Sequence, residues 1–151
     1  MECWNINRYK SDQVRYYNLY KYEKNKDDYL SMNITRYQRS LLAQFRCGIL
    51  PLEIEVGRFR DIDLCDRLCN MCSQNAVEDE IHFLCDCPAY SDHRRALFYH
   101  AELSDLTFSQ KDSIDKFVYL MSNHQKEVIY FLTNAVYRRI NTMYIINANN
   151  D

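Results

Sequence analysis

Glycine and proline are scarce in this sequence, with two of each among 151 residues. Small β-sandwiches and barrels need many turn residues, so this scarcity disfavours them and favours a mainly helical fold. Long apolar runs are also missing: no stretch approaches the roughly 18 apolar residues that a membrane helix requires. A phosphate-cradling loop needs several glycines, which two cannot supply. We therefore expect one small, mainly α-helical domain and no contact with a membrane.

Catalytic signatures are absent as well. No serine, histidine and aspartate surround a nucleophile elbow. The acidic pairs Asp61/Asp63 and Glu78/Glu80 are of the kind that binds Mg2+ in nucleases, but no lysine or histidine at a supporting spacing accompanies them. We interpret both pairs as solvated charge. The protein is therefore expected not to be an enzyme and to have no small-molecule substrate.

Cysteine, in contrast, is abundant for a chain of this length. There are seven cysteines, an odd number, and five of them fall between Cys65 and Cys87. An odd count argues against a secreted framework of disulfides. Residues 1–8 lack the apolar core of a signal peptide. We therefore expect a reducing, intracellular compartment, either the nucleus or the cytoplasm.

Four of the clustered side chains have the spacing of metal ligands. Cys69 and Cys72, followed by His82 and Cys87, form a C-x2-C-x9-H-x4-C pattern. Three thiolates and one imidazole satisfy a tetrahedral Zn2+ ion and leave no open position, which is the arrangement of a structural site. We expect one zinc ion, whose binding free energy contributes to folding.

The fourth ligand has two candidates. Cys85 lies three residues after His82 and would share its face on a helix. Cys87 lies five residues after His82 but precedes Pro88, and a residue before proline is driven out of helical conformation, which lets the chain turn back. The residues favour Cys87 and leave Cys85 open. Buried thiols around a core histidine are the alternative explanation, although buried cysteines rarely cluster this closely. We do not expect His93, the nearest spare histidine, to be a ligand.

The segment also resembles a known family. The matching pieces are Leu42-Ala-Gln-Phe-Arg46, residues 52–59, Arg67-Leu-Cys-Asn-Met-Cys72, and residues 77–88, which contain Glu-Asp-Glu-Ile-His-Phe and a final Cys-Pro. In this order they are similar to the CCHC-type zinc-binding segment downstream of reverse transcriptase in non-LTR retrotransposon proteins, over about residues 29–98. The resemblance implies nucleic-acid binding and the ligands Cys69, Cys72, His82 and Cys87, with Cys65 and Cys85 as extra cysteines. Residues 47–50 depart from the family pattern, in which serine and histidine are common.

Charge is unevenly distributed along the chain. Residues 1–60 hold 11 Lys and Arg against 7 Asp and Glu, whereas residues 61–110 hold 3 against 10. An acidic zinc segment is a poor surface for phosphates, so we expect contacts with RNA or DNA in the first third. The arginines expected to make them are Arg36, Arg39, Arg46, Arg58 and Arg60. The alternative is that these arginines pair with acidic side chains in a protein-interaction or self-association scaffold held by a structural zinc ion.

Residue patterns predict where the secondary structure lies. Helices are expected at residues 35–47, 78–86, 92–103, from 109, and at 122–146. A short extended segment is expected at 52–56, where apolar residues alternate with glutamates. Residues 1–28 are expected to form a tyrosine-rich helical arm, with a helix at about 11–24. Residues 29–151 then form the zinc-binding helical domain, and the two parts together make a single domain.

Overall fold

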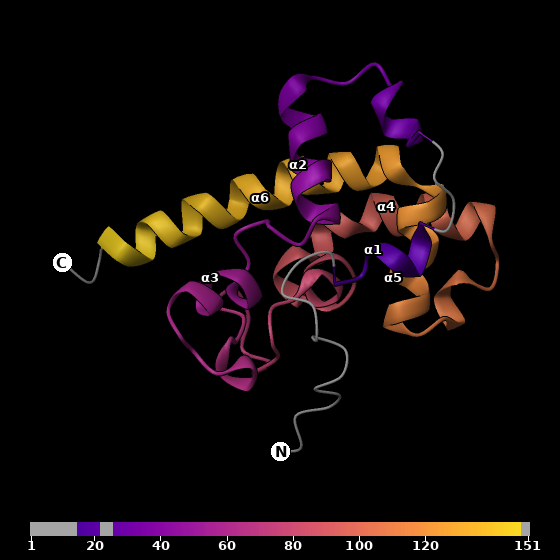
Figure 1. Cartoon of the computed structure of the whole chain (residues 1–151). Helices are drawn as coiled ribbons and strands as arrows, with labels where there is room; N and C mark the ends of the chain where they lie inside the picture. The colour runs from indigo at the N-terminus through magenta and orange to yellow at the C-terminus, as the bar shows by residue number, and fades with distance from the viewer. Residues whose placement is uncertain (1–14, 22–25, 149–151) are drawn as a thin grey trace.

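The structure, a computed structural model, describes residues 15–21 and 26–148. Within these ranges the chain forms helices and turns, with no strand and one isolated antiparallel bridge between Leu68 and Val77 (Figure 1). The prediction of a mainly α-helical fold is therefore confirmed. No helix in the described ranges has the length and apolar character needed to cross a membrane.

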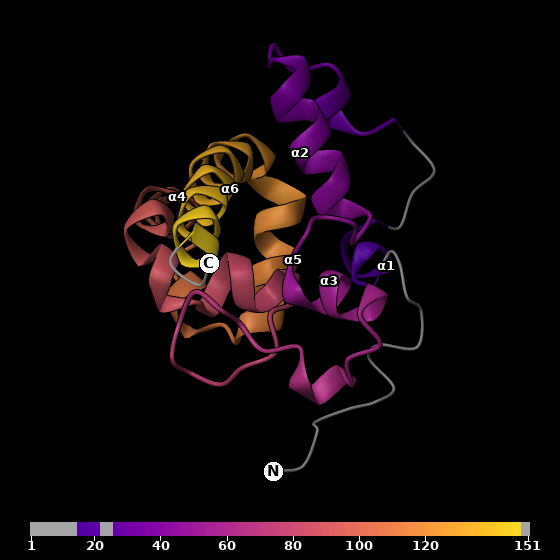
Figure 2. The same ribbon diagram turned by 90° about the vertical axis from the view of Figure 1, so that its left-hand side faces the viewer.

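One long helix organises the arrangement. The longer helices are α2 (Arg36–Arg46), α4 (Ser91–Ser104), α5 (Ser113–Asn123) and α6 (Gln125–Ala148), and the short ones are α1 (Tyr17–Tyr20) and α3 (Glu53–Phe59). Single 3-10 turns lie at Asp28–Leu30, Leu64–Asp66, Pro88–Tyr90 and Phe108–Gln110, and a π-helical turn at His82–Asp86. Helix α6 packs against α2, α4 and α5, and Figure 2 looks nearly along its axis.

Helix α2 begins and ends as its sequence predicts. The Thr35 hydroxyl accepts a hydrogen bond from the Gln38 N–H, and the Gln38 side chain accepts one from the Thr35 N–H, which completes a capping box. Gly48 follows the helix with φ of 68°, a conformation that favours glycine. The buried residues of its inner face include Leu41, Leu42 and Phe45, whereas Tyr37 is exposed.

Aromatic rings fill the core. Phe83 contacts Tyr90 and Phe131 edge to face, with ring centroids 4.8 Å and 5.5 Å apart. Tyr16 meets Phe117 of α5 in the same way at 5.5 Å. Such pairs add about 0.5–1.5 kcal/mol each to the free energy of burial. Tyr16 and Tyr20 thus belong to the same core as residues from the rest of the chain. The predicted helix at 11–24 falls partly outside the described residues, and α1 covers Tyr17–Tyr20.

The extended segment predicted at residues 52–56 is wrong. This stretch begins α3, and both Glu53 and Glu55 are buried. The alternation of glutamates with apolar residues therefore does not divide a solvent-exposed face from a buried one. The Glu78 carboxylate accepts a hydrogen bond from the Glu53 N–H at 2.8 Å and so caps the helix from outside it. Negative charge at a helix N-terminus is favourable, and this tertiary contact overrides the local pattern.

The start of α5 also differs from the prediction. The helix expected from Ser109 begins instead at Ser113, because Asp112 is the N-cap and its carboxylate accepts a hydrogen bond from the Asp115 N–H at 2.8 Å. Residues 108–110 form a separate 3-10 turn that buries Phe108.

Candidate metal centre

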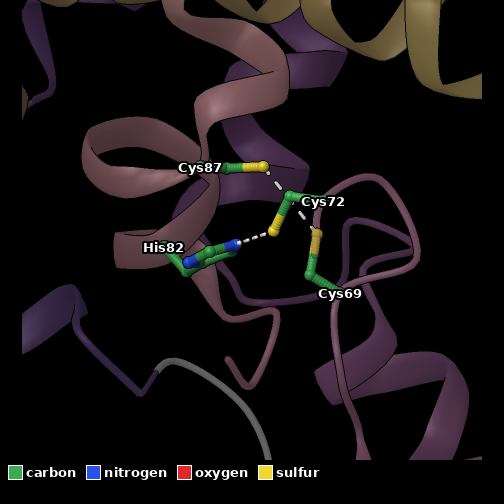
Figure 3. Close-up of side chains that lie close together, drawn as sticks. All are labelled: Cys69, Cys72, His82 and Cys87. Carbon is green, nitrogen blue, oxygen red and sulfur yellow. Dashed lines mark hydrogen bonds between the residues drawn. The ribbon is translucent and has the colours of Figure 1, made fainter. Parts of the chain in front are cut away.

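The structure brings together Cys69, Cys72, His82 and Cys87. One ligand atom from each lies within 4.8 Å of the other three. The Cys69 and Cys87 sulfurs are 3.8 Å apart, and the Cys72 sulfur is 3.5 Å from His82 Nε2 (Figure 3). Three of these side chains are buried and Cys72 is partly exposed. This Cys3His cluster can bind a metal ion.

A short loop supplies the first two sulfurs. The two sides of the loop meet at the bridge between Leu68 and Val77, where the Cys69 N–H donates to the Ala76 carbonyl at 2.9 Å. Between them, Asn75 adopts a positive φ of 50°, which asparagine tolerates better than most residues. The loop therefore folds back on itself and directs Cys69 and Cys72 toward the π-helical turn.

The π-helical turn supplies the other two ligands. The Cys87 N–H donates to the His82 carbonyl at 2.7 Å, which closes a turn of five residues. In an α-helix, residues five apart would point about 140° away from each other, whereas this wider turn returns Cys87 to the side of His82. Cys85 is buried outside the cluster, and burial raises the pKa of its thiol. The geometry therefore selects Cys87 over Cys85.

The acidic residues around the turn are interior, which corrects the interpretation of Glu78 and Glu80 as solvated charge. Glu78, Asp79 and Glu80 are all buried, whereas Asp61 and Asp63 are exposed. Asp79 holds the start of the turn: its carboxylate accepts from the His82 N–H at 2.8 Å. The other carboxylate oxygen accepts from the Tyr16 hydroxyl.

Glu78 connects the cluster to distant helices. Its carboxylate accepts from Cys69 Sγ at 3.5 Å and from Arg139 of α6 at 2.5 Å. Arg139 also donates to the Pro51 carbonyl at 3.2 Å and lies 3.4 Å from Glu53. Burial raises the pKa of Glu78, and the Arg139 guanidinium opposes that shift. Arg139 is thus a buried cation that holds two buried carboxylates beside a candidate ligand.

The sequence contained one signal that Arg139 is buried. The residues that α6 buries recur at helical spacing, and position 139 continues that series. They include Val128, Leu132 and Ala135. An arginine on an apolar helix face requires a buried acidic partner, but the sequence does not say which one.

A second buried ion pair lies on the other side of the turn. Arg15 donates to Glu80 at 2.7 Å and to the Gly48 carbonyl at 3.0 Å, and it lies 3.8 Å from Glu55. Burial raises the pKa of Glu80, and the hydrogen bond from Arg15 opposes that shift. Buried carboxylates are costly unless they are paired. Arg15 therefore offsets part of the acidic charge around the cluster.

The neighbouring thiols of Cys69 and Cys87 have pKa values shifted in opposite directions. The hydrogen bond between them raises the pKa of Cys69 and lowers the pKa of Cys87. Metal ions bind thiolates, so binding releases protons from such a pair. Cys87 is therefore the more readily deprotonated of the two.

The arginines predicted to bind nucleic acid differ in their burial and in their partners. Arg46 is buried, 2.8 Å from an Asp27 carboxylate oxygen. Its guanidinium carbon lies 5.2–5.3 Å from the ring centroids of three tyrosines, which are Tyr17, Tyr20 and Tyr29. These contacts are cation–π interactions. Arg46 therefore stabilises the interior and is not available to a phosphate.

The other four arginines are partly or fully exposed. Arg39 donates to the Met32 carbonyl at 3.1 Å, and Arg58 forms an ion pair with Glu55 at 2.6 Å. Arg36 and Arg60 are exposed, the first at the start of α2 and the second just after α3.

The other cysteines in the described part of the chain lie outside the cluster. Cys47 is an exposed free thiol, and Cys65 is disulfide-bonded. A disulfide is not what a reducing compartment favours, and the intracellular location expected from the sequence stays a prediction. His93 is not among the residues that come together.

Comparisons with protein-family models, with curated proteins and with solved structures find no match for this chain. The similarity to the retrotransposon zinc-binding segment therefore depends on the residues quoted for it and stays a prediction.

Proposed function

We propose that this chain is a non-catalytic protein-interaction domain whose fold is held by one structural zinc ion. The observation that carries the proposal is the convergence of three sulfurs and one imidazole nitrogen within 4.8 Å. The ion would be held by Cys69, Cys72, His82 and Cys87. When bound, it would cross-link the loop that carries Cys69 and Cys72 to the π-helical turn.

The donor set and its spacing support zinc. Thiolate and imidazole ligands suit Zn2+, whereas Mg2+ and Ca2+ prefer oxygen. With Zn–S bonds of about 2.3 Å and Zn–N bonds of about 2.0 Å, tetrahedral geometry places two sulfurs about 3.8 Å apart and a sulfur and a nitrogen about 3.5 Å apart. The ligand atoms of Cys69 and Cys87 are 3.8 Å apart and those of Cys72 and His82 are 3.5 Å apart, and all four ligand atoms lie within 4.8 Å of one another. These two pairs already have the spacing that the ion requires.

The count of ligands supports a non-catalytic role for the metal ion. Four protein ligands complete a tetrahedral shell, and a catalytic zinc keeps one position for water or substrate. The nearby carboxylates of Glu78 and Glu80 accept hydrogen bonds from Arg139 and Arg15, so they are engaged in structural pairs. A protein partner is favoured over a polyanion because Arg15 and Arg46 are engaged in buried ion pairs and Arg58 pairs with Glu55.

Metal content and ligand substitutions test the proposal. Purified protein should carry one equivalent of zinc, and replacement by Co2+ should give the absorption bands of a tetrahedral ion with three sulfur ligands. Cys72→Ser should lose the metal, while Cys47→Ser, which removes a free thiol outside the cluster, should retain it. Metal-free wild-type protein that folds fully in the presence of zinc, without taking it up, would contradict the proposal.

Nucleic-acid binding is a second candidate function, which the family resemblance implies. Of the five arginines expected to contact phosphates, Arg36 and Arg60 are exposed. Titration of labelled single-stranded RNA, single-stranded DNA and duplex DNA at several salt concentrations tests it. Binding that weakens steeply with salt and is lost in Arg36→Ala with Arg60→Ala would support it. No binding at low salt would end it for this chain.

A further inference from the structure

Helix α6 carries a line of exposed tyrosines on the side facing away from the core. Tyr130, Tyr137 and Tyr144 are 55%, 68% and 76% exposed. They are spaced seven residues apart, which is close to two helical turns, so the rings lie one above another. Ile140 and Ile145, 57% and 59% exposed, flank the line on its two sides. We call these five residues the tyrosine stripe.

The tyrosine stripe has little charge. Between Tyr130 and Tyr144 the charged residues are Arg138 and Arg139, and Arg139 points into the core toward Glu78. Two polar neighbours are satisfied within the helix. The Thr133 hydroxyl donates to the Ile129 carbonyl at 2.8 Å, and the Asn134 amide donates to the Tyr130 carbonyl at 2.9 Å. Covering the stripe therefore leaves few polar groups unpaired, and tyrosine-rich, charge-poor surfaces are typical of interface centres.

We propose that the tyrosine stripe is a self-association surface, on which α6 of a second copy of the chain packs antiparallel. A seven-residue repeat is what one helix presents to another that lies along it. The three tyrosines of the stripe are symmetric about Tyr137, so a two-fold axis there places Tyr130 of each copy opposite Tyr144 of the other. Such an interface uses the same patch on both copies and closes at a dimer. The antiparallel arrangement also sets the helix dipoles in opposition.

The surface available fits a weak dimer. The exposed parts of the three tyrosines amount to about 400 Å2, and those of the two isoleucines add about 200 Å2. Complete coverage in two copies would therefore bury about 1,200 Å2, which is at the low end for a specific interface. The C-terminal half of α6 projects beyond the other helices, which leaves room for a second helix beside it (Figure 1).

A hollow beside the stripe adds to this surface. It has a volume of about 350 Å3 and lies between α6 and residues 50–60. Ile140 and Tyr144 belong both to its lining and to the stripe. A bulky side chain of the second copy can enter it, as a buried anchor does at the centre of many interfaces.

Sedimentation of the zinc-loaded chain at increasing concentration tests the inference, which rests on the proposed role as an interaction domain. We expect a reversible dimer with a dissociation constant on the order of 10–100 μM. Because Tyr137 lies on the two-fold axis and is counted twice, Tyr137→Glu should weaken the dimer by about 100-fold or more. Tyr99→Glu, on the exposed side of α4 and outside the stripe, is the matched control and should leave it unchanged.

The outcomes separate this inference from the proposed function when metal content and thermal melting are measured on the same samples. A zinc-bound protein that stays monomeric to millimolar concentration would overturn self-association and leave the zinc proposal standing. A dimer that Tyr137→Glu and Tyr144→Glu both leave intact would overturn the assignment to the stripe. A dimer of metal-free, fully folded protein would contradict the proposed function instead.

Discussion

The metal region, residues 53–87, and the helical region, formed by α4, α5 and α6, differ in what fills their interiors. In the metal region, thiols, one imidazole and buried carboxylates lie beside one another, and arginines from elsewhere neutralise the carboxylates. In the helical region the buried side chains are mainly aliphatic and aromatic. Apolar packing is non-directional and tolerates gradual change. The metal region depends on a few directional contacts, so the loss of one should have a larger local effect.

Metal removal should produce the largest effect and should separate the two regions. Structural zinc sites bind with apparent free energies of about 10–16 kcal/mol, which are part of the folding free energy. After chelation, amide hydrogen exchange should accelerate most in residues 64–87 and least in α4–α6, as measured by mass spectrometry on peptides. Cys72→Ser should reproduce this pattern without a chelator. An unchanged circular dichroism spectrum, melting temperature and exchange pattern after complete metal removal would contradict the prediction.

Arg139→Met should have the next largest effect, because Glu78 and Glu53 would remain buried without their cation. Breaking a buried ion pair costs about 3–5 kcal/mol of unfolding free energy, measurable by urea titration. Loss of support for Glu78 should also weaken metal affinity by about 10–100-fold.

Two further variants sharpen the Arg139 prediction. Arg138→Met, at the exposed neighbouring position, should change stability by less than about 0.5 kcal/mol. Adding Glu78→Gln to Arg139→Met removes one unpaired charge and should recover part of the lost stability. If the two single arginine variants behave alike, the link between α6 and the cluster is wrong.

Leu132→Ala tests the helical region alone. The side chain is fully buried in α6, and such truncations cost about 3 kcal/mol. Metal content should stay at one equivalent, because this aliphatic side chain supplies neither charge nor a hydrogen bond to the cluster. The same substitution at exposed Leu103 of α4 should cost less than about 0.5 kcal/mol. Metal loss in Leu132→Ala would show that the two regions are more tightly coupled than we infer.

Arg46→Lys should have the smallest of these effects. Lysine keeps the positive charge, but it lacks the flat guanidinium that lies against three tyrosine rings. We expect a loss of about 1–2 kcal/mol in unfolding free energy. Arg36→Lys, at the exposed start of the same helix, is the matched control. Equal stability of both variants would argue against a role of the tyrosine rings.

Local sequence patterns predicted the features that depend on residues close together in the chain, such as the start of a helix. The capping box of Thr35 and Gln38 marks the start of α2, and the cysteine and histidine spacing anticipated which four side chains come together. Cys87 joins them through the π-helical turn as well as the proline that follows, and a π turn has no sequence signature that we could use. That these four residues bind zinc stays a prediction.

Features that depend on distant residues were not predictable in the same way. The glutamates of α3 look solvent-facing until Arg15, Arg139 and Glu78 are placed around them. Glu78 and Arg139 are 61 positions apart, and the local sequence around each residue does not identify its partner. Arg46 likewise pairs with an aspartate 19 positions earlier in the chain. Long-range charge pairing was therefore the main gap in the prediction.

The contact between Glu78 and Arg139 also has a consequence for the order in which the protein is made. The last cluster residue, Cys87, leaves the ribosome 52 residues before Arg139 does. At about 5–20 residues per second, this interval is about 3–10 s. During that time the nascent chain holds all four cluster residues while Glu78 and Glu53 still lack their cation. The cluster and the carboxylates beside it can therefore exclude water only after α6 has been synthesised.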